Sequence, residues 1–477
     1  MNSPLQYVFF VLFALNSESF AKMVEPSQSY CYSSDIKPNR NYATKTTYFQ
    51  SINSSNSILE ESTNDSNCTV KFIYYLSRHG TRHNGDKGIR EWQQHLPKLR
   101  EHILKFPNKT QLCQKDIEII ANWSLRMKPE DDKDLVETGK REQKFIAQEM
   151  RKRFPDFFAQ NDLLEDYEFR HSKEKRTRDS ALAFLEGLFG TSNNVQLTRS
   201  PEKDTLLHFY KHCDKYIEEV QNKPRIEYDK FLKGPEMQAV IKRVNERLAL
   251  TNPIEYKTLE SIYDNCVFEY GIYNDAPWCS VFQREDINII EYAEDIKYYW
   301  EDSYPHKVTV EQTCKLVSDI WKHLRNAKEK KDKRKIVGRW AHSATMNTLY
   351  TRLGLYKDEK QLLHNNYEQQ KDRRWRTTLH TPMSSSIAFV LLQCKDDFTV
   401  RAFHMEKLIK LDGICAEKNC KWSEIEGKFK PIADNCNFEE ICKVSKGDSS
   451  AIATKPFIQL ITLMTLISIS LRMFFYV

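Results

Sequence analysis

The sequence lacks a strong excess of charge of either sign. Its 477 residues include 72 Lys and Arg against 66 Asp and Glu, so the formal net charge is only +6. Nucleic acid is therefore not predicted as a partner, whereas a local basic pocket for a small anion fits this balance. Hydrophobic residues make up 40% of the chain and aromatic residues 12%. These fractions are typical of a folded globular protein, and the length allows one large domain or two to three smaller ones.

The sequence also lacks a clear metal site. His208 and His212 have the spacing of a metal-binding pair on a helix, but no third ligand is evident near them. The cysteine spacings have no matching histidine cluster of the kind that zinc sites use. No metal and no other cofactor is therefore predicted.

Twelve cysteines instead suit disulfides formed in an oxidising compartment. The local pairs Cys415/Cys420 and Cys436/Cys442 are expected to close small loops. Cys31 stands alone in a polar stretch over residues 22–67, so we expect a disulfide to tie down an irregular N-terminal extension.

The first apolar run of the chain, Tyr7–Leu15, is too short to span a membrane. Small and polar residues follow it, and Ala21 ends a candidate cleavage site. Residues 1–21 are therefore predicted to be a signal peptide, although the usual positive n-region is missing. Five motifs for N-linked glycans agree with a secretory address, at Asn53, Asn64, Asn67, Asn108 and Asn122.

A second apolar segment, Phe457–Val477, ends the sequence, and the small polar stretch Lys446–Ala451 precedes it. This order is typical of a glycosylphosphatidylinositol attachment signal, which predicts a membrane contact through a C-terminal lipid anchor. A single transmembrane helix with Arg472 near one end is the alternative. In both cases the body of the protein is expected outside the cytosol, on the outer face of the plasma membrane, in the extracellular space or in the lumen of the endoplasmic reticulum.

The most informative stretch is Phe72–Arg82. Its apolar and aromatic start predicts a buried strand that ends at Ser77, and Arg78, His79 and Arg82 follow directly. Paired guanidinium donors suit the oxygens of a tetrahedral dianion, and a neutral imidazole can attack phosphorus. A basic surface loop is the alternative, but an Arg-His-Gly-x-Arg sequence directly after an apolar strand is far more specific.

This stretch resembles the histidine acid phosphatases, and later stretches from Cys68 to Cys442 are similar to the multiple inositol polyphosphate phosphatases among them. The resemblance implies an α/β fold of the histidine-phosphatase type, like that of phosphoglycerate mutase. Such a fold is a sandwich around a central, mostly parallel sheet with an inserted α-helical cap domain. It also implies a covalent phosphohistidine intermediate on His79.

The resemblance further divides the chain into parts. The expected parts are a signal peptide (1–21), an irregular extension (22–67), an α/β catalytic domain (68–90, 135–203 and 305–412), a helical cap (91–134 and 204–304), a disulfide-rich segment (413–446) and an anchor signal or membrane tail (447–477).

Two more catalytic residues follow from the resemblance. Arg176 stands where the family carries a third phosphate-binding Arg, ahead of an apolar helix over 181–189, with Arg178 as a less favoured substitute. His342 ends a predicted strand over 335–342 and would hydrogen-bond the phosphoryl group. Lys87 and Arg90 would share one face of the helix after the signature, so they are candidate substrate-binding residues, although solvated helix charges are the commoner outcome.

One position departs from the family pattern. Related sequences read His-Ala-Glu or His-Asp at this place, and the acidic residue protonates the leaving oxygen. Here Ala344 stands at the Glu position, and neither Ser343 nor Thr345 has a suitable pKa. Because a general acid contributes about 10²–10⁴-fold to a rate, activity would survive in weakened form, or His83 or a Glu of the cap would serve instead.

The remaining pattern predicts ordinary core elements. The run Asp372–Arg376 is expected to be an exposed basic face without a site role. Further strands are expected at 167–170, 387–392 and 398–403, and helices at 87–105, 135–154, 343–355 and over most of 204–300.

The sequence thus predicts a secreted or cell-surface phosphomonoesterase that acts through a phosphohistidine, most simply a glycosylated monomer. The resemblance implies inositol polyphosphates as substrates, with 2,3-bisphosphoglycerate as a further possibility. The alternative is a catalytically impaired protein that binds inositol polyphosphate on the same fold, and a phosphotransferase is a third reading.

Overall fold

The computed structural model describes residues 30–35, 41–54, 68–159, 164–190 and 195–444. The predicted signal peptide, the C-terminal tail and the glycan motifs at Asn64 and Asn67 lie outside the described residues. Asn108 and Asn122 are both exposed. Among the described residues, no helix combines the length and apolar character needed to cross a membrane.

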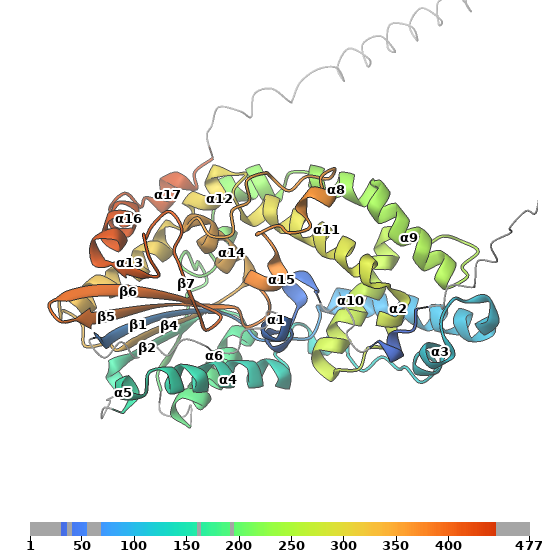
Figure 1. Ribbon diagram of the computed structural model, residues 1–477, viewed down its shortest axis with the longest axis horizontal. Helices are drawn as coiled ribbons and strands as arrows, with labels where there is room; N and C mark the ends of the chain where they lie inside the picture. The colour runs from blue at the N-terminus through green and yellow to red at the C-terminus, as the bar shows by residue number, and fades with distance from the viewer. Residues whose placement is uncertain (1–29, 36–40, 55–67, 160–163, 191–194, 445–477) are drawn as a thin grey trace, which may run out of the picture.

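A mixed sheet of eight strands forms one half of the molecule (Figure 1). Its order is β3-β2-β4-β1-β5-β6-β7, with β8 paired to β6. The neighbours β3, β2, β4 and β1 pair in parallel, and β5 joins β1 antiparallel. The strands are β1 (Cys68–Arg78), β2 (Tyr167–His171), β3 (Leu197–Arg199), β4 (Ile336–Ala341), β5 (Ser386–Cys394), β6 (Asp397–His404), β7 (Lys407–Ile409) and β8 (Asn419–Lys421).

Helices cover both faces of this sheet, so its central strand is buried on both sides. Successive residues of β1 point to opposite faces; Phe72 and Tyr74 enter one hydrophobic cluster and Ile73 and Tyr75 the other. One face is covered by α4 (Glu137–Arg153) and α6 (Lys175–Phe189), and the other by α13 (Cys314–Lys328), α14 (Ser343–Arg352) and α16 (Trp422–Asp434). The predicted α/β sandwich with a mostly parallel central sheet is confirmed.

The other half of the molecule is helical and has its own hydrophobic cluster (Figure 1). Residues 207–220 differ from the rest of the predicted cap range, since Leu207, Phe209 and Val220 pack in the cluster beside the sheet. The helices that contribute to the separate cluster are α2 (Asp86–Lys105), α3 (Gln114–Ala121), α8 (Ile226–Lys233), α9 (Pro235–Arg247), α10 (Tyr256–Tyr273) and α11 (Arg284–Asp302).

Short helices complete the described parts of the chain. They include α1 (Tyr48–Ser54), α5 (Pro155–Phe158), the 3-10 helix η6 (Phe209–Lys211), α7 (Asp214–Tyr216), α12 (Lys307–Glu311), α15 (Thr377–His380) and α17 (Phe438–Ile441).

All twelve cysteines form disulfides, and most of these bonds join distant parts of the chain. The local pair Cys415–Cys420 is confirmed. The pairing of Cys436 with Cys442 was wrong, because Cys436 is bonded to Cys314 and Cys442 to Cys213. The other five bonds are Cys31–Cys113, Cys68–Cys394, Cys213–Cys442, Cys266–Cys279 and Cys314–Cys436.

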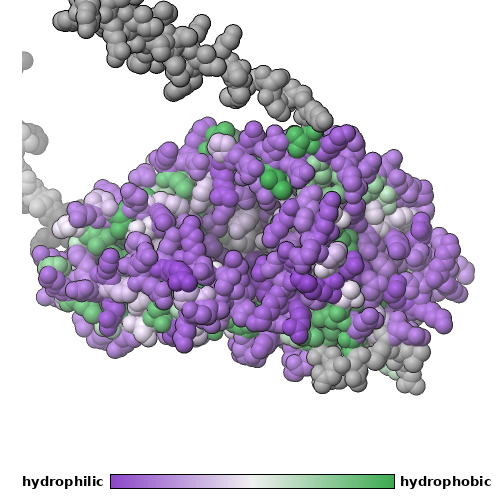
Figure 2. All heavy atoms as spheres, turned by 180° about the vertical axis from the view of Figure 1, so that it is seen from behind, coloured by the Kyte–Doolittle hydropathy of each residue, from purple (hydrophilic) through white to green (hydrophobic). Residues whose placement is uncertain are grey.

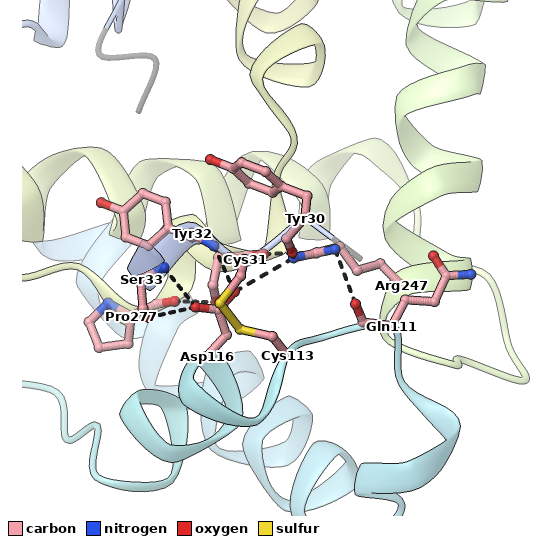
Figure 3. Close-up of a disulfide and its surroundings, with 10 residues drawn as sticks. Tyr30, Cys31, Tyr32, Ser33, Gln111, Cys113, Asp116, Arg247 and Pro277 are labelled. Carbon is pink, nitrogen blue, oxygen red and sulfur yellow. Dashed lines mark hydrogen bonds and ion pairs between the residues drawn. A yellow bond between two sulfur atoms is a disulfide. The ribbon is translucent and has the colours of Figure 1, made fainter. Parts of the chain in front are cut away.

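Cys31 ties the N-terminal extension to the helical half, as expected, and a buried ion pair supports this bond (Figure 3). The Asp116 carboxylate accepts hydrogen bonds from the backbone amides of Tyr32 and Ser33, both at 2.9 Å, and lies 3.7 Å from Arg247. Arg247 also donates to the Tyr30 carbonyl at 2.5 Å. Apart from the disulfide, these hydrogen bonds hold the extension through its backbone atoms. Attachment of this kind does not require apolar side chains, which agrees with the polar sequence of the extension.

The basic run 372–376 is only partly exposed: Asp372 and Arg374 lie at the surface, but the expectation was wrong for Arg373 and Trp375. Arg373 is buried, and its Nη2 lies 2.5 Å from Asp295 of α11. Arg376 contacts Glu291 of the same helix at 2.8 Å, and Trp375 is fully buried between them. Two buried acids on α11 attract these cations, so the run joins the segment before β5 to the helical half.

The surface carries few large apolar side chains. Figure 2 shows the rear face as mostly hydrophilic, with hydrophobic residues in small separate groups. Among the described residues, the large hydrophobic side chains that are exposed are Leu104, Ile226 and Leu379. They do not form a contiguous apolar surface of the kind that marks a large interface.

Candidate active site

Three parallel strands end side by side and bring the predicted residues to one edge of the sheet. The backbone amide of His79, after β1, donates to the carbonyl of Ala341 in β4 at 3.1 Å. The amide of Ser172, after β2, donates to the carbonyl of Trp340 at 3.0 Å. Because β4 lies between β2 and β1, the residue after β4, His342, stands between the other two strand ends.

His79 is oriented with one ring nitrogen free to react. Its side chain is 3% exposed, and Nδ1 lies 2.9 Å from the carbonyl oxygen of Gly80. A carbonyl only accepts, so Nδ1 carries the proton and Nε2 keeps its lone pair. Burial and the nearby charges of Arg176 and Arg78 hold the pKa of His79 well below its usual range. The ring is therefore a neutral nucleophile rather than an imidazolium.

Three arginines surround this ring, and acidic side chains do not fully balance their positive charge. Burial and the neighbouring Arg82 lower the pKa of Arg78 to about 9, and burial together with Arg176 lowers that of Arg82 to about 10. Arg78 Nη1 is fixed by the carbonyls of Thr44 and Thr381 at 2.5 and 2.7 Å. Crowded, desolvated cations of this kind favour the binding of a multiply charged anion.

His342 links the third arginine to the nucleophile. Its ring centroid lies 5.5 Å from that of His79, and its Nδ1 lies 3.4 Å from Arg176 Nη2. Because a guanidinium only donates, Nδ1 accepts and Nε2 carries the proton, which it donates to Ser172 Oγ at 2.8 Å. His342 also precedes α14, whose first backbone amides are free to bind an anion.

The loop formed by residues 78–82, hereafter the signature loop, is held in place by α4. No role for this helix was predicted from the sequence. The buried Glu142 carboxylate accepts from the Thr81 amide at 3.0 Å and from Thr81 Oγ1 at 2.7 Å. Gln143 Nε2 donates to the Arg78 carbonyl at 3.2 Å. A Cβ on Gly80 would lie 2.6 Å from the Gly139 carbonyl oxygen, so two glycines are needed where the helix meets the loop.

His208 is a site residue that the sequence analysis missed. It is 2% exposed, and its ring stacks on His342 with a centroid distance of 4.1 Å and an interplanar angle of 6°. Its spacing from His212 is that of a metal-binding pair, but its ring stacks on His342 instead. This contact forms because the chain packs against the sheet again after residue 204. No local sequence motif predicts it.

Other predicted residues lie away from this arrangement. Lys87 and Arg90 are on the exposed side of α2, where Arg90 lies 3.3 Å from Asp86. His83 follows Arg82, and burial lowers the pKa of its ring. The structure therefore does not bring these side chains into the group formed by His79, Arg176 and His342.

The described residues contain one grouping with the geometry of a metal site, and its chemistry does not fit an ion. It consists of Cys31, Cys113 and Asp116. The two sulfurs are bonded to each other, so neither is a thiolate. The carboxylate oxygens are already occupied by the extension (Figure 3).

The position of the missing acid lies at the start of α14. Ala344 is half-buried against the cluster beside the sheet, and the next residue, Thr345, donates its hydroxyl to the Leu207 carbonyl at 2.7 Å. Neither side chain supplies a proton donor for a leaving alcohol. The segment that carries His208 therefore packs directly on the turn that lacks the acid.

Comparison with known proteins agrees with this geometry. The chain is 28% identical to multiple inositol polyphosphate phosphatase 1 of Drosophila melanogaster, over 88% of this chain and 91% of that protein. It is 27% identical to the Homo sapiens protein of the same name, over 80% and 84% of the two chains.

Two solved structures share the fold. The phytase from D. castellii superposes with a TM-score of 0.67 at 14% identity, over 85% of both chains. The Bifidobacterium longum multiple inositol polyphosphate phosphatase in complex with inositol hexasulfate superposes with a TM-score of 0.64 at 13% identity, over 82% of this chain and 97% of that one.

The family description "Histidine phosphatase superfamily (branch 2)" matches residues 69–405, well over half of the sequence. The resemblance and the phosphatase class expected from the sequence are thereby confirmed, and the chain belongs to branch 2 of the histidine phosphatase superfamily.

Proposed function

We propose that this protein hydrolyses phosphate monoesters of inositol polyphosphates through a covalent phosphohistidine on His79. The observation that carries the proposal is a neutral imidazole with a free Nε2 beside three guanidiniums whose pKa values are all lowered. A dianionic phosphoryl group relieves the repulsion among Arg78, Arg82 and Arg176 and places phosphorus in reach of that nitrogen. The names of the curated relatives supply the substrate class.

The reaction then has two steps. His79 Nε2 bonds to phosphorus as the ester P–O bond breaks, and water later attacks phosphorus and releases His79. The Arg176 guanidinium holds oxygens of the transferring group, and its contact with His342 Nδ1 positions it at the end of β4. We also propose 2,3-bisphosphoglycerate as a substrate, since it too carries more than one phosphate monoester.

The proposal includes an address in the secretory pathway. Six disulfides that account for all cysteines are typical of an oxidising compartment. The signal peptide, N-linked glycans at Asn108 and Asn122, the C-terminal lipid anchor and a monomeric state extend this proposal.

Phosphate release from inositol hexakisphosphate by the purified protein tests the activity. We expect steady release by the native protein, and none above background with His79→Ala. His95→Ala is the matched control, since His95 is a half-exposed histidine of α2. Release that persists in His79→Ala would contradict the phosphohistidine route.

A second candidate function rests on Ala344. Without an acid at this position, the same cationic pocket would bind inositol polyphosphate with negligible turnover. Calorimetric binding of inositol hexakisphosphate without phosphate release at any pH from 4.5 to 7.5 would favour this binding protein, and steady release would exclude it.

A further inference from the structure

His208 lies on a segment that packs against the turn carrying Ala344. The segment before it is folded by Asp204, whose Oδ1 accepts from the amides of Leu206 and Leu207 at 3.1 and 2.9 Å. The Leu207 carbonyl then accepts from Thr345 Oγ1 at 2.7 Å. Leu207, the residue before His208, is thus hydrogen-bonded to Thr345, the residue after Ala344.

The histidine side chains form a row from the nucleophile outward. The ring of His79 lies 5.5 Å from that of His342, and His342 stacks on His208 at 4.1 Å. In an in-line displacement the leaving oxygen departs on the side of phosphorus away from His79. A group beyond His342, on the segment that packs against the turn carrying Ala344, is therefore on the appropriate side.

Of the carboxylic acids near the row, Asp204 is buried and caps its own segment through Oδ1, while its Oδ2 has no hydrogen-bond partner among the described residues. Glu174 and Asp302 are engaged. Glu174 lies 3.6 Å from Arg176, which it partly neutralises. Asp302 is 4% exposed and accepts from Asn347 Nδ2 at 3.2 Å, so it is turned into the protein. His208, by contrast, stacks on His342 and meets the ring of Tyr210 edge to face at 5.5 Å.

We propose that His208 is the general acid of this protein, and the base for the second step, in place of the acidic residue lost at position 344. This inference rests on the proposed phosphatase function and names a further catalytic residue for it. In the first step the His79 Nε2 lone pair bonds to phosphorus, the P–O electron pair moves to the ester oxygen, and this oxygen takes a proton from the His208 imidazolium. In the second step neutral His208 removes a proton from water as its oxygen bonds to phosphorus, and the P–N electron pair returns to His79.

The charge around His208 also indicates which substrates it would serve. Burial and the surrounding cations Lys211, Arg176, His212 and Lys173 lower the pKa of His208 to about 3, and the rings of His342 and Tyr210 complete its surroundings. The ring is thus neutral in the free protein and needs added negative charge to hold a proton. A substrate with several phosphates supplies that charge, so multiply phosphorylated alcohols are favoured over single alkyl phosphates.

The test compares esters whose leaving groups differ in basicity. A general acid matters for an alcohol that leaves poorly, such as that of glycerol 2-phosphate, and little for p-nitrophenol. With His208→Gln we expect kcat for inositol hexakisphosphate to fall about 10²-fold and kcat for p-nitrophenyl phosphate to change less than about threefold. His95→Gln, a half-exposed histidine of α2 outside the ring row, is the control and should match the native protein on both esters.

Rescue provides a second arm. Ala344→Glu introduced into His208→Gln should restore most of the lost rate on inositol hexakisphosphate, because the new carboxyl group occupies the vacated role. Equal losses on both esters, no loss on either, or no rescue would overturn the role of His208.

A third measurement needs no variant. Native rates over a series of bisphosphate esters, whose second phosphate supplies the charge that His208 needs, should depend only weakly on the pKa of the leaving alcohol, and a steep dependence would overturn general-acid catalysis. Native protein that fails to hydrolyse p-nitrophenyl phosphate in a His79-dependent manner would instead refute the proposed function itself.

Discussion

At the scale of single residues, the site is dominated by cations that destabilise one another until an anion arrives. Arg78, Arg82 and Arg176 each have a pKa below the usual range because burial removes water from them. Arg78 and Arg82 also carry unfavourable interactions with neighbouring guanidiniums. Burying such a cluster of cations lowers the stability of the folded protein, and a bound phosphate raises that stability again.

Arg176→Lys tests how far geometry rather than charge matters. The ammonium keeps the charge but cannot hold both a phosphoryl oxygen and His342 Nδ1 in a planar arrangement. We expect kcat/KM for inositol hexakisphosphate to fall about 10²-fold. Arg178→Lys, an exposed neighbour in α6, is the control, and an undiminished rate in Arg176→Lys would contradict the assigned role.

At the scale of secondary structure, the contact between α4 and the signature loop leaves no room for side chains. A Cβ on Gly139 would overlap the backbone of Thr81, while Glu142 and Gln143 of the same helix bond to the loop. The loop conformation therefore depends on a helix that begins about sixty residues further along the chain.

Gly139→Ala should accordingly lower the free energy of unfolding by about 1–3 kcal/mol, since the added methyl group forces the helix and the loop apart. Gly427→Ala is the matched control, because a Cβ there meets nothing within 4 Å in α16. That substitution should raise the stability by about 0.5–1 kcal/mol. Urea unfolding of both variants measures the contrast, and equal stabilities would show that the contact tolerates a side chain.

The elements were predictable wherever a local pattern determines them. The apolar runs before His79 and His342 predicted β1 and β4, and the helix after Arg176 was recognised from its apolar residues. Arg373 was misjudged because its burial depends on Asp295, which lies far away in sequence. His208 and the partners of Cys436 and Cys442 were missed for the same reason, since the tertiary fold alone brings them together.

At the scale of the whole molecule, acidity acts on several buried groups at once. Burial lowers the pKa of His380 well below its usual range and that of His404 to about 4. Such histidines contribute stability above their unfolded pKa of about 6.5, and this contribution is lost as pH falls below that value. Buried carboxyls act in the opposite direction, since burial raises the pKa of Asp302 and Glu406 to about 7.

His380→Phe isolates one of these contributions. His380 is 1% exposed and lies 4.8 Å from the ring of Tyr356 and 4.6 Å from that of Trp375, so a phenyl ring suits the site. The difference in free energy of unfolding between variant and native protein should shift in favour of the variant by up to about 1.4 kcal/mol per pH unit below pH 6.5. Urea titrations at pH 7.5, 6.5 and 5.5 measure it, and a difference independent of pH would show that His380 is not held neutral.

The N-terminal extension is a further link between the active site and the helical half of the molecule. Its Thr44 carbonyl grips the guanidinium of Arg78, and its Cys31 is covalently bound to the helical half at Cys113. Lys45, the residue after Thr44, lies 3.0 Å from Asp264 of α10 and 3.2 Å from Glu294 of α11. The helical half thus helps to fix a phosphate-binding side chain, and we expect a looser attachment of this segment to weaken the capture of the substrate.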